Sequence, residues 1–330
     1  EKDIVLSSAL IDMYAQCGVI EKAQAVHGEL PLRDVMSWTE LIVGYVQHEQ
    51  GHGVLNCLEN MQIEGLLPNE VTFVNIFKAC VITGSIDKGE QILDEVLSMG
   101  FLLKENNMLG NVLVDMYAKC GALANAQEVF EELHIRDIVS WNALISGYSQ
   151  GKQSYEALNC LERMHLDNIQ PDSILLACIL RACSCIGDRG KGLAVHTQIL
   201  QEGFGGDIVI GSALIDMYVK FGLLAEAEVM LDKLQVRTVF TWTTLITGYV
   251  CHGCDDSALD CFERMQEEFI SPDDITLACT LNACGNLGSK NKGSKVFSQI
   301  VSKGLERDDY IGNSLVDMYV KCGLLAEAQE

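Results

Sequence analysis

The sequence predicts an all-α solenoid, in which short helix-turn-helix repeats stack in a row. One observation is a phrase that occurs four times at nearly constant spacing, as SALIDMYAQCG from Ser8, NVLVDMYAKCG from Asn111, SALIDMYVKFG from Ser212 and NSLVDMYVKCG from Asn313. Another is that two further phrases recur between its copies. A third is that apolar residues within the units follow helical spacing. Self-similarity at a period of about 20 to 50 residues is typical of stacked repeats.

The repeats form cycles of three units. The Asp-Met-Tyr triplets of the first phrase start at Asp12, Asp115, Asp216 and Asp317, which are 103, 101 and 101 residues apart. A second phrase starts at Val35 (VMSWTELIVGY), Ile138 (IVSWNALISGY) and Val239 (VFTWTTLITGY), and a third at Val71, Ile174 and Ile275. Each cycle of about 101 residues therefore holds three related units of 31, 35 and 35 residues, and two extra residues near Glu105 to Asn107 account for the spacing of 103. The chain is a tandem of roughly ten units.

Each unit has the pattern of two helices joined by a turn. In the unit that contains Gly151, the apolar residues of each half are spaced by one or three, which is helical and not alternating. These residues are Leu144, Ile145 and Tyr148 in the first half, and Ala157, Leu158, Leu161 and Met164 in the second. Turn residues separate the halves near Gly151, and Pro171 ends the unit.

Composition agrees with a stacked, soluble array. A two-helix hairpin of this size cannot bury its own apolar stripe, so it must pack on its neighbours. The hydrophobic content of 48% fits such packing, and no uncharged run reaches the length of a membrane helix. Eleven of the 14 cysteines recur at equivalent positions. We expect them to act as small apolar residues on buried helix faces, without disulfides, in a reducing compartment.

The fixed rotation of the three phrases resembles the PLS subclass of pentatricopeptide repeat (PPR) proteins. The resemblance covers essentially all 330 residues, and it implies one array with the shape of a right-handed superhelical α-solenoid. Its register gives short (S) units at 4–34, 107–137 and 208–238, P units at 35–69, 138–172 and 239–273, long (L) units at 70–106, 173–207 and 274–308, and a partial S unit at 309–330. Because the sequence starts and stops within this pattern and shows no transit peptide, we expect a fragment of a longer protein.

The resemblance also implies a function: each repeat reads one base of single-stranded RNA. Its fifth and last residues contact the base edge, for which short polar side chains are suited. The pairs are Ser8 with Asp34, Thr39 with Asn69, Asn111 with Asp137, Asn142 with Asp172, Ser212 with Thr238 and Thr243 with Asp273, and Asn313 is the fifth residue of the partial unit.

The family's code turns these pairs into a target. Thr or Ser with Asp resembles a guanine reader, Thr with Asn an adenine reader, and Asn with Asp a uracil reader that tolerates cytosine. The L units have Val74, Ala177 and Ala278 at the fifth position, which cannot hydrogen-bond through their side chains, and the pair Ser212 with Thr238 departs from the code. The implied target is 5′-G-A-n-U/C-U/C-n-n-G-n-3′.

The second residues of the units are all apolar or aromatic. They are Val5, Met36, Val71, Met108, Val139, Ile174, Val209, Phe240, Ile275 and Tyr310. The resemblance implies that they lie between successive bases, and such side chains can sandwich bases with little sequence preference. The alternative is that each is a core residue at the start of a helix.

The charge of the chain speaks against strong nucleic-acid binding. The net charge is −23, whereas Lys and Arg contacts to phosphates usually supply most of the affinity. We expect acids such as Glu156, Glu162 and Glu267 to lie on second helices, which face the convex side. The expected result is weak affinity for RNA with a shallow dependence on salt.

Several strings resemble enzyme or metal motifs, and we interpret them as sequence drift within repeats. His48-Glu49-Gln50-Gly51-His52 matches a zinc-protease string, but here it spans the turn between two helices. Cys251-His252-Gly253-Cys254 lacks a second cysteine pair, and His27-Gly28-Glu29 lacks the other half of a deaminase signature. We expect no catalytic residue, no metal site and no cofactor, and hence no enzyme.

The favoured function is therefore sequence-specific RNA recognition. Within the PLS subclass, this implies the site-recognition module of a cytidine-to-uridine editing factor in a mitochondrion or chloroplast, with the editing chemistry outside this chain. Implied protein partners are multiple-site organellar editing factors bound at the L units, and neither a membrane nor a small-molecule substrate is expected. The alternative is a helical-repeat scaffold that binds proteins, which the acidic balance favours.

Overall fold

A computed structural model describes residues 4–103, 105–305 and 308–328, with the side chains of Ile4 and Val5 left out, and its regular structure there is entirely helical. The chain divides into two compact units, residues 1–170 and 171–330. We describe each unit by itself.

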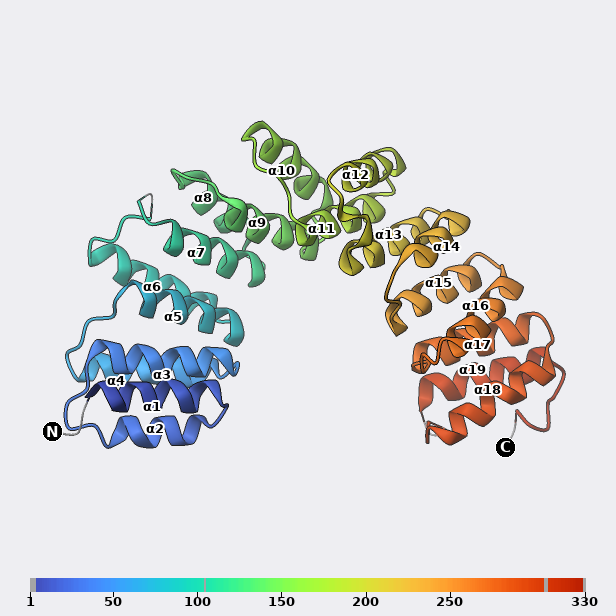
Figure 1. Ribbon diagram of the computed structural model, residues 1–330, viewed down its shortest axis with the longest axis horizontal. Coiled ribbons are helices and arrows are strands. Elements are labelled where there is room, and N and C mark those ends of the chain that lie inside the picture. Colours follow the sequence, from blue (N-terminus) through green and yellow to red (C-terminus); the bar gives the residue numbers. More distant parts are fainter. Residues whose placement is uncertain (1–3, 104, 306–307, 329–330) are drawn as a thin grey trace. The chain divides into compact units, whose positions relative to one another are not determined.

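The first unit contains five helical hairpins within its described residues (Figure 1). The helices are α1 (Ile4–Gln16), α2 (Ile20–Gly28), α3 (Val35–Gln47), α4 (Gly51–Ile63), α5 (Glu70–Thr83), α6 (Ile86–Ser98), α7 (Asn107–Lys119), α8 (Leu123–Glu132), α9 (Ile138–Gln150) and α10 (Ser154–Leu166).

The second unit continues the same alternation. Its helices are α11 (Ser173–Ile186), α12 (Arg189–Gln201), the short 3-10 helix η1 (Phe204–Gly206), α13 (Ile208–Lys220), α14 (Leu224–Lys233), α15 (Val239–Cys251), α16 (Asp255–Glu267), α17 (Asp274–Asn286), α18 (Lys290–Ser302) and α19 (Asp309–Lys321).

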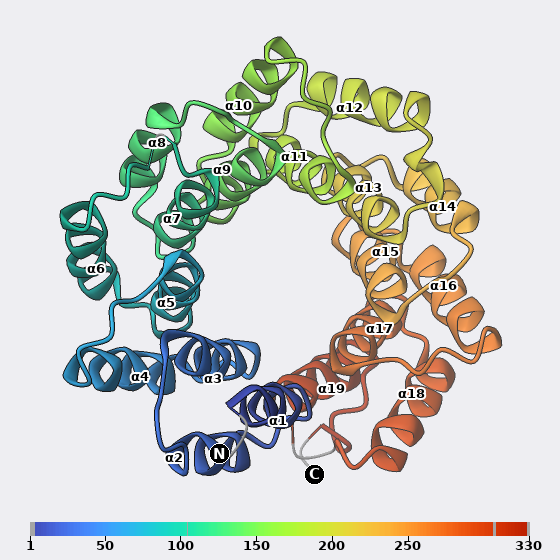
Figure 2. The same cartoon turned by 60° about the vertical axis from the view of Figure 1, so that its left-hand side comes forward.

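Within each unit the helices form two rows. Each odd-numbered helix packs against the next odd-numbered helix and against the even-numbered helix of its own hairpin. Figure 2 shows the odd-numbered row on the inner side of each unit and the even-numbered row on the outer side. The core between the rows is apolar and includes the fully buried side chains of Trp141, Phe130 and Trp242. The prediction of an all-α fold built from stacked helical hairpins is confirmed.

Two recurring glycines have different roles: one ends a helix, and the other lets neighbouring hairpins pack closely. Gly121 follows α7 with a φ of 83°, in the left-handed region that favours glycine and ends the helix. Gly147 lies inside α9, where an added Cβ would come within 2.6 Å of the Ala118 side chain. A side chain at position 147 would therefore separate α7 from α9.

The recurring cysteines divide into a buried and a less buried group. Burial raises the pKa of the Cys57, Cys160 and Cys261 thiols to about 12, so they remain protonated and apolar at neutral pH. The expectation of burial is wrong for Cys17, which is exposed, and only partly right for Cys120, Cys178 and Cys322, which are half-buried. Cys17, Cys120 and Cys322 come directly after the last residue of a helix.

The described residues include no helix that is both long enough and apolar enough to cross a lipid bilayer.

Candidate nucleic-acid interface

The last residue of each proposed repeat caps the helix that follows it. In every case the side chain accepts a hydrogen bond from a backbone N–H in the first turn. These residues are Asp34, Asn69, Asn106, Asp137, Asp172, Asp207, Thr238, Asp273 and Asp308. The sequence analysis missed this role, although the spacing of Asp34 to Ser37 and of Asn69 to Thr72 is that of a capping box.

The structure brings Asn111 and Asp137 into direct contact. The amide Nδ2 of Asn111 lies 3.0 Å from both carboxylate oxygens of Asp137. The Oδ1 atom of Asn111 is buried and has no hydrogen-bond partner among the described residues. This pair therefore holds an oriented acceptor that a ligand with an N–H group could satisfy.

Two further pairs are joined through a third residue. Thr243 Oγ1 lies 3.4 Å from Asp273 Oδ1 and 2.6 Å from Thr276 Oγ1. Thr39 Oγ1 lies 2.8 Å from Thr72 Oγ1, which in turn donates to Asn69 Oδ1 at 2.9 Å.

The remaining predicted residues are less closely connected. The Ser212 hydroxyl donates a hydrogen bond to the backbone carbonyl of Ile208, while Thr238 caps α15. Ser8 is buried in α1 beside Glu40, and its predicted partner Asp34 caps α3. Asn142 lies in the first compact unit, where it lines a cavity of about 730 Å³, and Asp172 caps α11 in the second compact unit. Asn313 is exposed on α19.

Two of the predicted base-reading pairs line cavities. One of about 730 Å³ is lined by Asn111 and Asp137, with Met108 and Val139 as second residues of consecutive repeats. The other, of about 670 Å³, is lined by Thr243 and Asp273, again with the two second residues, Phe240 and Ile275. Both cavities thus combine a polar pair with two apolar side chains from adjacent repeats.

The second residues are exposed rather than buried. Their exposed fractions lie between 45 and 66% for the nine with described side chains. These are Met36, Val71, Met108, Val139, Ile174, Val209, Phe240, Ile275 and Tyr310. The side chain of Val5 lies outside the described residues. The alternative that these are core residues at a helix start is therefore wrong for all nine, because the first turn of each odd-numbered helix points them away from the core.

The fifth residues of the L units, in contrast, are buried. Val74, Ala177 and Ala278 are at most 8% exposed. Val74 lies in the wall of the 730 Å³ cavity.

Two of the three lysines that line the cavities are already paired with acids, and the third, Lys78, is exposed. Lys119 contacts Asp115 at 2.9 Å and Lys220 contacts Asp216 at 2.8 Å, in both cases one helical turn apart. Lys119 lies at the 730 Å³ cavity and Lys220 at the 670 Å³ cavity. In the first P unit, burial and the charges of Asp12 and Asp34 raise the pKa of Glu40. The surface around the predicted readers therefore carries little free positive charge.

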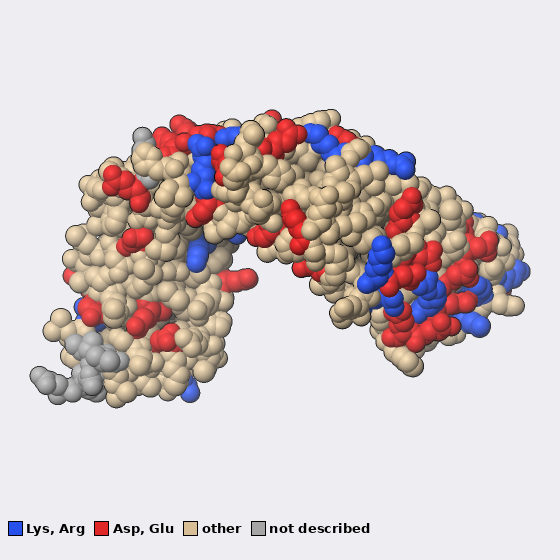
Figure 3. Space-filling view, turned by 45° about the horizontal axis from the view of Figure 1, so that its top comes forward, with Lys and Arg blue, Asp and Glu red and all other residues tan. Residues whose placement is uncertain are grey.

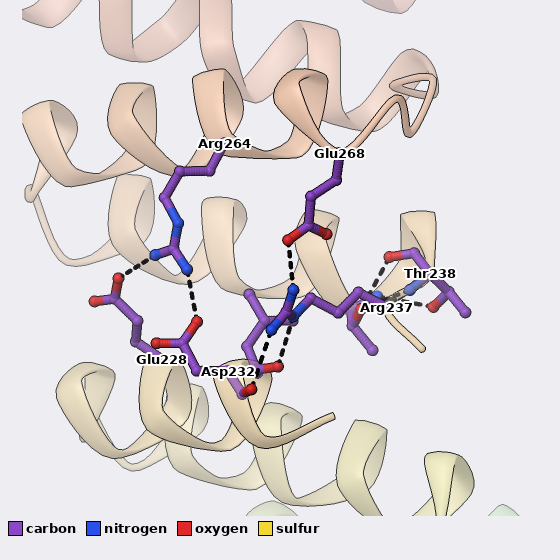
Figure 4. Close-up of polar contacts among 8 residues, drawn as sticks. Glu228, Asp232, Arg237, Thr238, Arg264 and Glu268 are labelled. Atoms are coloured by element: carbon purple, nitrogen blue, oxygen red, sulfur yellow. Dashed lines mark hydrogen bonds and ion pairs between the residues drawn. The ribbon is translucent and has the colours of Figure 1, made fainter. Parts of the chain in front are cut away.

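The even-numbered helices carry ion pairs between neighbouring repeats. Arg264 of α16 donates to Glu228 and Asp232 of α14, each at 2.6 Å, and Arg237 contacts Glu268 (Figure 4). Figure 3 shows acidic and basic side chains interleaved at the right-hand end of the second unit. Glu156, Glu162 and Glu267 are exposed on α10 and α16, so their predicted place on second helices is confirmed.

The first P unit differs from the others in this outer row. Arg163 lies 5.6 Å above the ring of Trp141, and Arg264 lies 5.3 Å above that of Trp242. Asn60 occupies the equivalent position in α4. A cavity of about 340 Å³ remains there, lined by Trp38 and Asn60.

The motif-like strings have structural explanations. His48 follows α3 and His52 lies in α4, with Glu49 between them at a φ of 56°, so the zinc-protease string spans a turn as predicted. His27 is buried and packs edge-on against Trp38. Among the described residues, no three His, Cys, Asp or Glu side chains are grouped closely enough to hold a metal ion.

Family models match several parts of the chain. A PPR repeat model matches residues 5–35, 111–138, 139–169 and 212–239. A PPR repeat family model matches 237–286, and a pentatricopeptide repeat domain model matches 32–83.

Curated relatives from Arabidopsis thaliana match nearly the whole chain. A mitochondrial pentatricopeptide repeat-containing protein is 33% identical over 99% of this chain and 38% of its own length. A chloroplastic one is 30% identical over 98% of this chain and 37% of its own length. The chain thus spans less than half of these relatives.

A solved structure shares the fold. The crystal structure of the pentatricopeptide repeat protein PPR10 from maize superimposes with a TM-score of 0.60 at 18% identity, covering 98% of this chain and 53% of that protein. Together with the family models and the relatives, this shows that the chain belongs to the pentatricopeptide repeat family.

Proposed function

We propose that this chain binds single-stranded RNA and reads one base in each P and S repeat. The fifth and last residues contact the base edge, and the second residues of consecutive repeats lie on its two faces. One observation carries the proposal: at both cavities, a polar pair is flanked by exposed apolar side chains from two adjacent repeats. Aromatic and apolar faces stack on any base, whereas the polar pair discriminates between edges.

The ligand class agrees with a relative of the same fold. Maize PPR10 has been solved in complex with an 18-nt psaJ RNA element. The division of this chain into S, P and L units, and with it the target 5′-G-A-n-U/C-U/C-n-n-G-n-3′, belongs to the same proposal.

The organellar role extends the proposal to the whole protein. Relatives are named mitochondrial or chloroplastic, which supports action in one of these organelles. We place the chain in a cytidine-to-uridine editing factor, as its site-recognition module. The buried, apolar fifth residues of the L units are unsuited to base reading, and we propose that these units instead contact multiple-site editing-factor proteins.

The first test is direct binding. A fluorescent RNA that carries 5′-GAnUUnnG-3′ is compared with a scrambled RNA and with the DNA equivalent, at low and moderate salt. Preference for the designed RNA is expected. Equal binding to all three, or none, would reject the reading register and favour a scaffold that binds proteins.

A matched pair of variants tests the sandwich. Phe240→Ala should weaken binding of the designed RNA by about 1–3 kcal/mol, because one stacking face is lost. Phe269→Ala removes a side chain of the same type that is 96% exposed and lies after α16, outside the cavities, so it should bind as the parent does. Equal losses in both variants would contradict the proposed role of Phe240.

A further inference from the structure

We propose that Thr72 and Thr276 are positioning residues that set which hydrogen-bonding groups the preceding repeat presents to its base. Each is the third residue of an L unit and is fully buried, so it belongs neither to the fifth nor to the last position of the repeat it serves. This inference rests on the proposed function, since it concerns how the same base is read.

At the second site, one hydroxyl links both readers. Thr276 Oγ1 lies 2.5 Å from Asp273 Oδ1 and 2.6 Å from Thr243 Oγ1. The carboxylate can only accept, so Thr276 donates its single hydrogen to Asp273. Thr243 must then donate to Thr276. The hydrogen bonds between these side chains therefore all run in one direction, from Thr243 through Thr276 to Asp273.

The direction of these hydrogen bonds determines which groups remain available to a base. Asp273 Oδ1 also accepts from the backbone N–H of Thr276 at 2.8 Å, which leaves Oδ2 as the oxygen available to a ligand. Thr243 has given up its hydrogen and offers only lone pairs. The site therefore presents two acceptors, which match the adjacent N1–H and N2–H₂ donors of guanine.

The first site contains an equivalent set of side chains, but its last residue is an asparagine instead of an aspartate. Asn69 Oδ1 accepts from the backbone N–H and the hydroxyl of Thr72, both at 2.9 Å, so its Nδ2 is the group left for a base. Thr39 donates its hydroxyl hydrogen to the backbone carbonyl of Val35 at 2.6 Å and lies 2.8 Å from the Thr72 hydroxyl, so it offers only lone pairs to a base. One acceptor and one donor match the N6–H₂ and N1 groups of adenine.

One P unit of the protein lacks this hydroxyl. In the second P unit the corresponding residue is Leu175, which is fully buried, and the fifth residue is Asn142 instead of threonine. Among the three P units, a threonine at the fifth position thus occurs with a threonine at the third position of the next unit, and the one asparagine occurs with a leucine.

The test measures base preference at one position. Thr276→Val keeps the branched shape and the backbone cap but removes the hydroxyl, so Thr243 regains a free donor. We expect the preference for G over A at the eighth base of 5′-GAnUUnnGn-3′ to fall roughly five- to tenfold, the worth of one hydrogen bond. Thr276→Ser should keep the preference. Thr72→Val removes one of the two hydrogen bonds that orient the Asn69 amide, so the preference for A over G at the second base should also fall, by a smaller factor.

Controls separate this inference from the proposed function. Thr241 is buried at the third position of α15, but its hydroxyl donates to the backbone carbonyl of Thr238, so Thr241→Val should leave base preference unchanged. If the parent chain has no base preference, the proposed function fails. If the parent discriminates and both valine variants discriminate equally well, or lose affinity equally for all four bases, this inference is overturned. Thermal unfolding of each variant checks folding, and the two sites report independently.

Discussion

At the scale of single residues, His27 shows how one substitution in a repeat creates a pH dependence. Phe130 and Leu231 occupy the equivalent positions in later repeats, whereas His27 packs against Trp38 with ring centroids 4.2 Å apart. Burial, followed by the charge of Arg33, lowers its pKa to about 4. The unfolded chain therefore binds a proton at a higher pH than the folded chain does.

The sign of the effect follows from this shift. Since the folded pKa lies below the ordinary value, stability is retained above pH 6.5 and falls as the pH decreases from there toward 4. Between pH 7 and pH 5 this histidine should remove about 2 kcal/mol of stability. His27→Phe restores the residue type of Phe130 and should flatten that part of the profile, as measured by urea unfolding. An unchanged slope between the parent and the variant would refute the assignment.

At the scale of helices, the first P unit lacks the arginine that covers its tryptophan. In the third cycle, Arg264 covers Trp242 and donates to Glu228 at 2.6 Å. The equivalent residues in the first cycle are Asn60, Trp38 and Gln24, and the cavity of about 340 Å³ lies between them.

Filling this cavity should stabilise the first unit. The double variant Gln24→Glu with Asn60→Arg recreates the contacts of Glu228 and Arg264, and we expect a gain of about 1 kcal/mol from stacking and ion pairing. Gln24→Glu alone is the control and should bring a smaller gain, because Arg33, which also lines the cavity, is already paired with Glu64. Thermal unfolding distinguishes the two. A double variant that unfolds no later than the control would show that the arginine does not reach the ring.

At the scale of the whole chain, the net charge of −23 opposes binding of a polyanion. Lys119 and Lys220 lie at the cavities, but each is neutralised by an aspartate one turn away. Replacing Asp115 and Asp216 by Asn should free both lysines, raise RNA affinity and steepen the salt dependence.

A second double variant controls for the change in net charge by replacing two acids that lie away from the cavities. Glu156→Gln with Glu267→Gln changes the net charge by the same amount on the even-numbered helices, away from the cavities. Binding titrations at several salt concentrations should show a smaller gain for this pair. Equal gains in the two double variants would indicate that only total charge matters.

The sequence predicted the fold well because the same local signals return every 101 to 103 residues, so helix spacing, turn glycines and phrase order support one another. It identified Asn111 and Asp137 as a pair, which the structure brings into contact. It could not show that Met36 or Phe240 is exposed, because an apolar residue in a first turn has the same pattern whether it faces the core or the solvent. The hydroxyl of Thr276 was also missed, since its contacts join two different repeats.

The caps that begin the odd-numbered helices also constrain how such an array could change during evolution. A last residue must retain an oxygen that accepts from the helix N-terminus, and its loss costs about 1 kcal/mol. Asp and Asn both satisfy this demand, and their codons differ only in the first nucleotide. If the last residue reads a base as proposed, a single point mutation can exchange the two residues at position 69 or 273 and alter the preferred RNA base while the helix stays capped. On this proposal, the repeats could adapt one at a time to changes in the target RNA sequence, and no intermediate protein would lose a helix cap.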